Sequence, residues 1–361
     1  MHFALPPRKA SHPLPYARKP PPPPNAQRNR RQLQILGYVT LSVLTFLLVL
    51  KYFWSSGRNV EDGPSEIEGR QDIVIVTVFN NDTMSDEYMR MIRSNRDHYA
   101  SRHGYHNFYT NTAFYADLVE PSPSSWSLIP ALRHALTVYP RSTFFWSLSA
   151  DALITTPSLS LEEHILQPLE SLMHKDVPVV PPDSVIHTFS RIKPSRTRLV
   201  ISQDANNLAD TSFIVRNTPP SPTSSDSWAQ YFLDAWFDPL YRAYAFQKAQ
   251  THALEHLVQW HPTILAKLVL IDQRRMNSYN FASPPSRDPV TRVARSHDSM
   301  WQEGDLVVNF KGCRDDEKRN CQEELREYFS KWERDIVKLD TSPVDHAQTP
   351  RPERAVVEGK T

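Results

Sequence analysis

Residues 72–79 read DIVIVTVF, and this run of β-branched apolar residues has the length of one strand. Both of its faces are apolar, which predicts a central strand of a parallel sheet that is covered on two sides. A polar turn follows at 80–88, then a helical pattern over 89–103 and a second strand over 106–110. This order of strand, loop, helix and strand is typical of the start of a nucleotide-binding α/β sheet.

The same alternation continues over residues 72–339, which we expect to form one domain. Its hydrophobic patterns predict helices at 125–139, 161–174, 228–236, 245–260 and 321–339, and strands at 143–148, 177–180, 211–215 and 305–310. The predicted fold class is α/β with a mixed, mainly parallel sheet. Residues 340–361 are polar and contain prolines, so we expect a disordered tail there.

A membrane segment is expected ahead of this domain. Residues 33–54 read LQILGYVTLSVLTFLLVLKYFW and carry no charge from 33 through 50. As a helix they would span roughly 33 Å, enough for the core of a bilayer. Residues 1–32 contain basic but no acidic residues, which predicts a cytosolic tail, a transmembrane signal anchor at 33–54, a lumenal stem at 55–71 and a lumenal domain. A cleaved signal peptide is disfavoured, since no small-residue cleavage site follows.

The composition narrows the classes of function. The 41 basic and 40 acidic residues nearly cancel, so the chain lacks the positive excess of a nucleic-acid-binding protein. A hydrophobic content of 40% is sufficient for a core, which excludes global disorder.

Asp151 follows the predicted strand 143–148, where the carboxyl ends of parallel strands open onto a ligand crevice. A carboxylate there could hold a divalent cation that neutralises the diphosphate of a nucleotide sugar. It could equally cap the segment that follows, and spacing alone leaves both interpretations open.

Several segments occur in the order seen in one known family. They read IVIVTV, NRDHYASRHGYHNFY, FFWSLSADALITTPSLSLEEHIL, AFQKAQTHALEHLVQWHPTIL and GDLVVNFKGC. Through them residues 72–315 resemble the retaining galactosyl-, xylosyl- and mannosyltransferase family of GT-A fold, and within it the fungal Golgi alpha-1,6-mannosyltransferase subunits of mannan polymerase. The resemblance implies transfer of mannose from GDP-mannose to mannan or N-glycan chains in the Golgi membrane, with Mn²⁺ or a similar cation and other mannosyltransferase subunits as partners.

The resemblance also implies roles for particular residues. The family's strand ends in Asp-x-Asp where this chain has Ser149-Ala150-Asp151, and Asn309 stands where the family has a metal-binding His. Asp151 and Asn309 are thus the expected metal ligands, and the neutral replacements would hold a cation weakly. Asp204 is the expected catalytic residue facing the transferring sugar. The expected donor or acceptor contacts are Ser149, Asp151, Gln273, Asn277 and Tyr279.

Two thiols and one sequon bear on the compartment. Cys313 and Cys321 are the only cysteines, and in an oxidising lumen they could close one disulfide or stay as two free thiols. Asn81 begins an Asn-Asp-Thr glycosylation sequon.

Other conspicuous residues are expected to be structural. His252 and His256 lie one helical turn apart, but the spacing of a zinc protease motif is missing, so a packed or solvated helix is expected. Core packing is expected for Trp126, Trp146, Trp236 and Trp260.

Two functions remain open at this stage. The chain is either an active retaining mannosyltransferase or a non-catalytic structural subunit of a mannosyltransferase complex. The retained Asp151 favours the first function, whereas the replacements at Ser149 and Asn309 favour the second.

Overall fold

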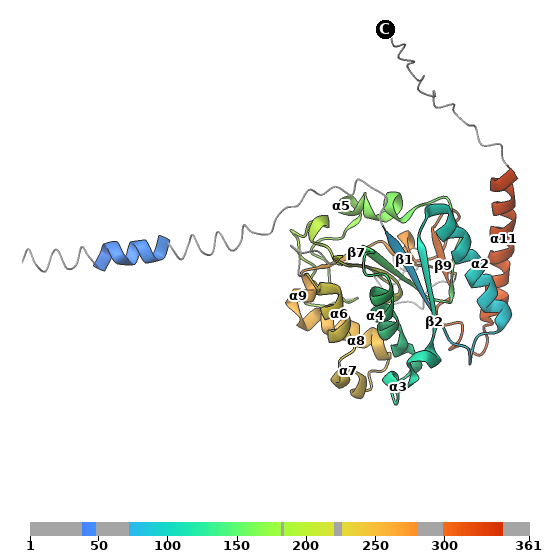
Figure 1. Cartoon of the computed structure of the whole chain (residues 1–361), viewed down its shortest axis with the longest axis horizontal. Helices are drawn as coiled ribbons and strands as arrows, with labels where there is room; N and C mark the ends of the chain where they lie inside the picture. The colour runs from blue at the N-terminus through green and yellow to red at the C-terminus, as the bar shows by residue number, and fades with distance from the viewer. Residues whose placement is uncertain (1–37, 48–71, 182–183, 220–225, 281–298, 342–361) are drawn as a thin grey trace, which may run out of the picture. The chain divides into compact units, whose positions relative to one another are not determined.

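The computed structural model describes residues 38–47, 72–181, 184–219, 226–280 and 299–341 (Figure 1). The chain divides into two units, Met1–Ser65 and Glu66–Thr361. Of the first unit only residues 38–47 are described, and they are helical. No helix within the described residues is both long and apolar enough to cross a bilayer. The rest of the predicted anchor, the tail 1–32 and the stem 55–71 lie outside the described residues, so the anchor stays a prediction.

The second unit is built on a six-stranded sheet. Its strands lie in the order β2-β1-β3-β6-β5-β7. They are β1 (Ile73–Phe79), β2 (His106–Asn111), β3 (Phe144–Leu148), β5 (Leu199–Gln203), β6 (Leu208–Arg216) and β7 (Leu268–Ile271). All pairings are parallel except the two made by β6. The prediction of a mixed, mainly parallel sheet with a central β1 is confirmed.

The alternating faces of β1 explain its continuous apolar sequence. Val74 and Val76 belong to the core on one face of the sheet, with α4 (Leu128–Val138), α6 (Trp228–Trp236) and α8 (Ala249–Trp260). Ile73 and Ile75 belong to the core on the other face, with α2 (Asp86–His103). All four side chains are buried, since successive residues of a strand point to opposite faces.

Helices cover both faces (Figure 1). They are α2 (Asp86–His103), α3 (Ala116–Val119), α4 (Leu128–Val138), α5 (Leu169–Leu172), α6 (Trp228–Trp236), α7 (Pro239–Ala243), α8 (Ala249–Trp260), α9 (Pro262–Leu265) and α11 (Cys321–Thr341). Helix α11 lies beside α2, to which Gln322 and Arg326 bond through Glu87. Its apolar side, which includes Leu325 and Phe329, packs into a third core cluster. The helix continues to Thr341, two residues past the predicted end of the domain.

A second, three-stranded sheet carries the segment that leaves β3. Its order is β4-β9-β8, formed by β4 (Ala152–Ile154), β9 (Val307–Asn309) and β8 (Ser278–Tyr279). Strand β9 runs antiparallel to β4 and places Asn309 opposite Ala152. The residues after β3 and after β9 therefore meet.

Three local predictions were wrong. Residues 177–180 form no strand, only a single bridge from Pro178 to His187. The helix predicted over 161–174 is a π-turn at Glu162–Leu166 and a short α5, because Pro168 cannot donate the backbone hydrogen bond that a continuous helix needs. Trp260 is 71% exposed and lies outside the core, whereas the other three tryptophans named above are buried.

Candidate functional site

The parallel strands β1, β3, β5 and β7 end at one edge of the main sheet, where an α/β fold collects ligands. Three hollows lie in this region. The largest, of 760 Å³, is lined by Gln203, Asp204, Gln273, Arg274 and Asp305 among others, and is called the Asp204 cleft here. A second, of 580 Å³, is lined by residues that include Thr83, Ser85, Tyr88 and Arg314, and is called the Arg314 hollow. A third, of 560 Å³, lies at the ends of β1 and β2 beside Asn81 and Arg93.

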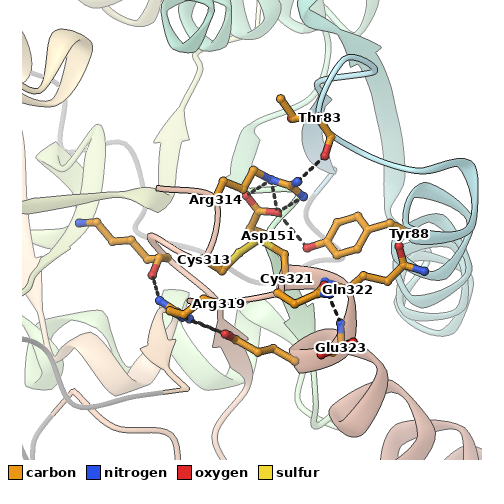
Figure 2. The surroundings of a disulfide bond; sticks show 12 residues. Thr83, Tyr88, Asp151, Cys313, Arg314, Arg319, Cys321, Gln322 and Glu323 are labelled. Carbon is orange, nitrogen blue, oxygen red and sulfur yellow. Dashed lines mark hydrogen bonds and ion pairs between the residues drawn. A yellow bond between two sulfur atoms is a disulfide. The ribbon is translucent and has the colours of Figure 1, made fainter. Parts of the chain in front are cut away.

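Asp151 is held by a cation from the same chain. Arg314 donates from Nε to both carboxylate oxygens at 3.0 Å and from Nη2 to Oδ1 at 2.6 Å (Figure 2). The Tyr88 hydroxyl donates to the same Oδ1 at 2.9 Å. This fork is the strong geometry for an arginine–carboxylate pair. The carboxylate predicted to hold a metal is thus already neutralised.

Helix α2 fixes the backbone that carries Asp151. The buried Arg96 donates to the carbonyls of Ser149 at 3.2 Å and Ala152 at 2.7 Å. Asn95 exchanges two hydrogen bonds with the backbone of Ile154. Burial lowers the pKa of Arg96 to about 10, so the guanidinium remains charged at neutral pH.

A disulfide fixes the segment that carries Arg314. Cys313 and Cys321 are bonded, with their Cα atoms 5.2 Å apart (Figure 2). Gly312 precedes the bridge with a φ of 76°, a left-handed conformation that favours glycine. The disulfide alternative is confirmed, and its geometric effect is to close the loop between Arg314 and helix α11.

Asp204 is the other paired carboxylate. Lys311 donates to its Oδ2 at 2.7 Å and the Tyr279 hydroxyl at 2.9 Å. The backbone N–H groups of Asn206 and Asn207 donate to its Oδ1 at 2.9 and 2.8 Å. Because Lys311 and Arg314 are three residues apart, one short segment after β9 supplies the cations for both carboxylates.

Electrostatics keep Asp204 ionised. Burial alone would raise its pKa, but Lys311 and the hydrogen bonds from Asn206 and Tyr279 hold the pKa of Asp204 below its ordinary value. Burial would likewise lower the pKa of Lys311, yet Tyr279, Asp204 and Asp210 raise it. The pair is therefore charged at neutral pH.

Two further acids lie behind Asp204. Asp210 accepts from Thr251 at 2.9 Å, and burial raises its pKa. Glu255 accepts from the side chain of Asn207 and the backbone N–H of Leu208, both at 2.9 Å, and burial raises its pKa too. Glu255 therefore serves the loop of Asp204, and the residues of helix α8 belong to no group of possible metal ligands within the described chain.

The predicted donor or acceptor lip is a buried layer. Asn277 accepts from Asn309 at 2.9 Å, and Gln273 donates to the carbonyl of Asn277 at 3.1 Å. The side chains of Asn277 and Asn309 are fully buried, and Tyr279 is almost so. Of these residues only Gln273 lines the Asp204 cleft. Asn277 and Tyr279 thus support the site from within instead of presenting an exposed lip.

The residues expected to bind a divalent cation do not fit one. Ser149 accepts a hydrogen bond through its hydroxyl from the N–H of Asp151 at 3.1 Å. Asn309 directs its amide to Asn277. Among the described residues, the one group of possible ligands is Asp151 with Cys313 and Cys321, and both of these sulfurs are in the disulfide. Asp151 is then the sole anionic ligand, and Arg314 occupies it, whereas hard cations need several oxygen ligands.

Sequence reasoning missed Arg314, Lys311, Tyr88 and Arg96. All four are basic or phenolic side chains that act by pairing with distant residues. Arg314 and Asp151 are 163 positions apart. Only the proximity of Lys311 and Arg314 to Asn309 in the sequence could have pointed to the first two.

Comparisons with known proteins identify the family. The chain is 28% identical to an uncharacterized alpha-1,2-galactosyltransferase of Schizosaccharomyces pombe over 72% of this chain and 72% of that protein. It is 27% identical to the probable alpha-1,6-mannosyltransferase MNN11 of Saccharomyces cerevisiae over 72% of this chain and 62% of that protein. A solved glycosyltransferase involved in the glycosylation of the major capsid of PBCV-1 aligns with a TM-score of 0.43 at 11% identity, over 71% of this chain and 98% of that one. The model of the galactosyl transferase GMA12/MNN10 family matches residues 69–322, more than half of the chain, and the chain belongs to this family.

Proposed function

We propose that this chain is a retaining hexosyltransferase that moves mannose from GDP-mannose onto alpha-1,6-linked mannan chains of glycoproteins. The observation that carries the proposal is an ionised carboxylate, Asp204, on the wall of a 760 Å³ cleft at the carboxyl edge of the sheet. Membership of a glycosyltransferase family supports the reaction class. The alpha-1,6-mannosyl specificity rests on the likeness to MNN11 and MNN10, two probable alpha-1,6-mannosyltransferases of Saccharomyces cerevisiae.

The reaction exchanges one bond at the anomeric carbon of the donor sugar. The bond to the diphosphate oxygen breaks and its electron pair stays with the diphosphate. The acceptor hydroxyl oxygen bonds to the anomeric carbon, and its proton passes to the leaving phosphate. Asp204 stabilises the positive charge that develops on the sugar ring, which is electrostatic catalysis by a group fixed in advance.

The Asp204 cleft has room for the sugar acceptor. Its other wall carries Arg274, which donates to both oxygens of Asp305 at 3.0 and 2.8 Å. Such fixed polar groups suit the hydroxyl groups of a glycan. We assign the nucleoside to the hollow at the ends of β1 and β2, because it lies at the carboxyl edge of the sheet, where α/β folds bind ligands.

A non-catalytic subunit is the second candidate. It is favoured by the neutralisation of Asp151 by Arg314 and by the loss of the family's metal ligands at Ser149 and Asn309. In that case the chain supports a catalytic partner in a mannosyltransferase complex.

We further propose a Golgi membrane location with a cytosolic N-terminus. Support comes from the apolar sequence of 33–54, and from its described residues 38–47, where the large apolar side chains are exposed. Protease treatment of sealed microsomes should remove only a short N-terminal piece. Digestion of the domain in intact vesicles would overturn this topology.

Transfer assays decide between the two functions. The full-length chain in detergent would be given GDP-mannose or UDP-galactose with a mannose oligosaccharide, alone and with co-purified subunits, and the linkage of the product determined by NMR. Asp204→Asn should lower kcat at least about 100-fold, by analogy with the loss of other fixed electrostatic groups. The matched control is Asp234→Asn, because Asp234 is an exposed carboxylate that pairs with Arg133.

The transfer assays give different results for a different donor sugar and for a supporting subunit. Transfer from UDP-galactose alone would replace mannose as the donor sugar. Transfer by the complex that survives Asp204→Asn would make this chain the supporting subunit.

A further inference from the structure

We propose that Arg314 takes the place of the divalent cation in this chain and binds the diphosphate of the nucleotide-sugar donor directly. The ligand class is a nucleoside diphosphate, and the inference rests on the proposed function in so far as the donor is a nucleotide sugar. It concerns donor binding, which can be measured without turnover.

Arg314 has more hydrogen-bond donors than its partners in the chain use. A guanidinium has five N–H groups. Asp151 takes the N–H of Nε and one of Nη2, and the carbonyl of Thr83 takes one of Nη1 at 2.6 Å. The N–H groups left over are on the two terminal nitrogens, and Arg314 also interacts with the Tyr88 hydroxyl beside them. A guanidinium can donate from two neighbouring nitrogens to two phosphate oxygens.

The guanidinium of Arg314 lies at the wall of a hollow and is held in a fixed position. Arg314 lines the Arg314 hollow, and its side chain is 24% exposed. The guanidinium also lies 5.0 Å from the ring centroid of Tyr88, whose hydroxyl shares Asp151 (Figure 2). Asp151, Tyr88 and Thr83 thus hold the cation in one orientation from three sides. A cation that is fixed before binding loses little conformational entropy when the phosphate arrives.

Charged residues of both signs line the Arg314 hollow. Lys318 adds a positive charge there, whereas Asp316 and Glu317 add negative ones. Arg319 lines the same hollow but pairs with Glu324 at 2.6 Å. Apart from the paired Arg314 and Arg319, the hollow thus carries one positive and two negative charges. Attraction for a diphosphate therefore depends on the N–H groups of Arg314 that Asp151 and Thr83 do not take.

Arg314 and a divalent cation would compete for the carboxylate of Asp151. A divalent cation at Asp151 would have to displace an arginine bound through three hydrogen bonds, and it would gain only one carboxylate. Asn309 turns its amide to Asn277, and Ser149 already bonds to the backbone. Arginine binding at Asp151 therefore prevails over a metal ion.

Calorimetry on the full-length chain in detergent tests the proposal, with GDP and UDP as probes, in EDTA and in Mn²⁺. The wild-type affinity for the diphosphate it prefers should differ by less than about threefold between the two conditions. Arg314→Gln should weaken that affinity by about tenfold or more, as expected for a lost charge-assisted pair. The affinity for the nucleoside alone should not change. Arg326→Gln is the matched control, because Arg326 is a half-exposed arginine that pairs with Glu87 on the surface.

A second variant guards against misfolding. Arg314→Lys keeps a cation beside Asp151 but lacks the planar fork, and it should also weaken diphosphate binding while melting near the wild-type temperature. The inference is overturned if Mn²⁺ strengthens wild-type binding more than about threefold, or if Arg314→Gln binds as the wild type does. Metal-dependent transfer would overturn the inference and leave the proposed function standing. Metal-free binding of the diphosphate that depends on Arg314, without any transfer, would support the inference and overturn the proposed function.

Discussion

Replacing Lys311 by methionine should destabilise the domain more than any other single removal of a charge in the site. The substitution leaves Asp204, 7% exposed, without its cation. Removal of one partner from a buried ion pair costs about 3–5 kcal/mol. Because the side chain of Lys311 is still 30% exposed, solvent screens part of the loss, and we expect about 3 kcal/mol. At about 2 °C per kcal/mol for a domain of this size, the melting temperature should fall by roughly 6 °C.

The dependence of this loss on pH identifies its cause. The folded pKa of Asp204 is below the ordinary value of 3.8, so its stabilisation is fully present above pH 3.8 and is lost as the pH falls through the folded pKa. In Lys311→Met burial dominates and the pKa of Asp204 should rise instead. The carboxylate then destabilises the fold at neutral pH, and this cost disappears once both states are protonated. The difference in unfolding free energy between wild type and variant should therefore shrink as the pH is lowered from 7 to 4.

Urea unfolding at several pH values is the assay, since urea does not screen charges. Lys331→Met is the control, because Lys331 is 42% exposed and pairs with the exposed Glu303 at 3.2 Å. It should cost less than about 1 kcal/mol. Adding Asp204→Asn to Lys311→Met should recover part of the stability. If the Lys311 variant loses no more than the control, or if the second substitution lowers stability further, the reasoning on buried charge is refuted.

Two other predictions concern the segment that carries both cations. Replacing Cys313 and Cys321 by serine opens a loop with a sequence separation of 8 and should lower the free energy of unfolding by about 2.5 kcal/mol, measured in urea against the oxidised wild type. Ser149→Asp with Asn309→His should not produce Mn²⁺ binding detectable by electron paramagnetic resonance while Arg314 remains, and adding Arg314→Gln should produce it. Strong Mn²⁺ binding by the double variant would contradict the assignment of Arg314 to Asp151.

The sequence predicted the scaffold well, because periodicity reports burial. The run at β1 is apolar on both faces since both faces are covered, and β3 places Asp151 at the edge of the sheet as its position implied. Strands β5 and β7 were missed, because their apolar runs are only three and four residues long and are flanked by charged or polar residues. Such short runs take their conformation from their neighbours in the sheet.

The partners of the site were harder to predict for a different physical reason. A charged side chain carries no periodic signal, and its pairing depends on how remote segments fold together. Asp151 was recognised as a carboxylate at a strand end, but its binding by Arg314 requires β9 to pair with β4 and the chain to turn at Gly312. The full burial of Asn277 and Asn309 was not predicted, because it follows from the second sheet, which sequence patterns did not reveal.

The placement of the two cations bears on how the chain could change from metal-dependent to metal-free donor binding. A metal site needs clustered anions that repel one another until the ion arrives, which costs stability in its absence. Here each carboxylate has a cation from the same four-residue segment, Lys311 for Asp204 and Arg314 for Asp151, so the charges balance within the chain itself. The neutral Ser149 adds no second carboxylate beside Asp151 that Arg314 alone would have to balance. The substitutions that argue against a metal are thus the ones expected if Arg314 performs its role.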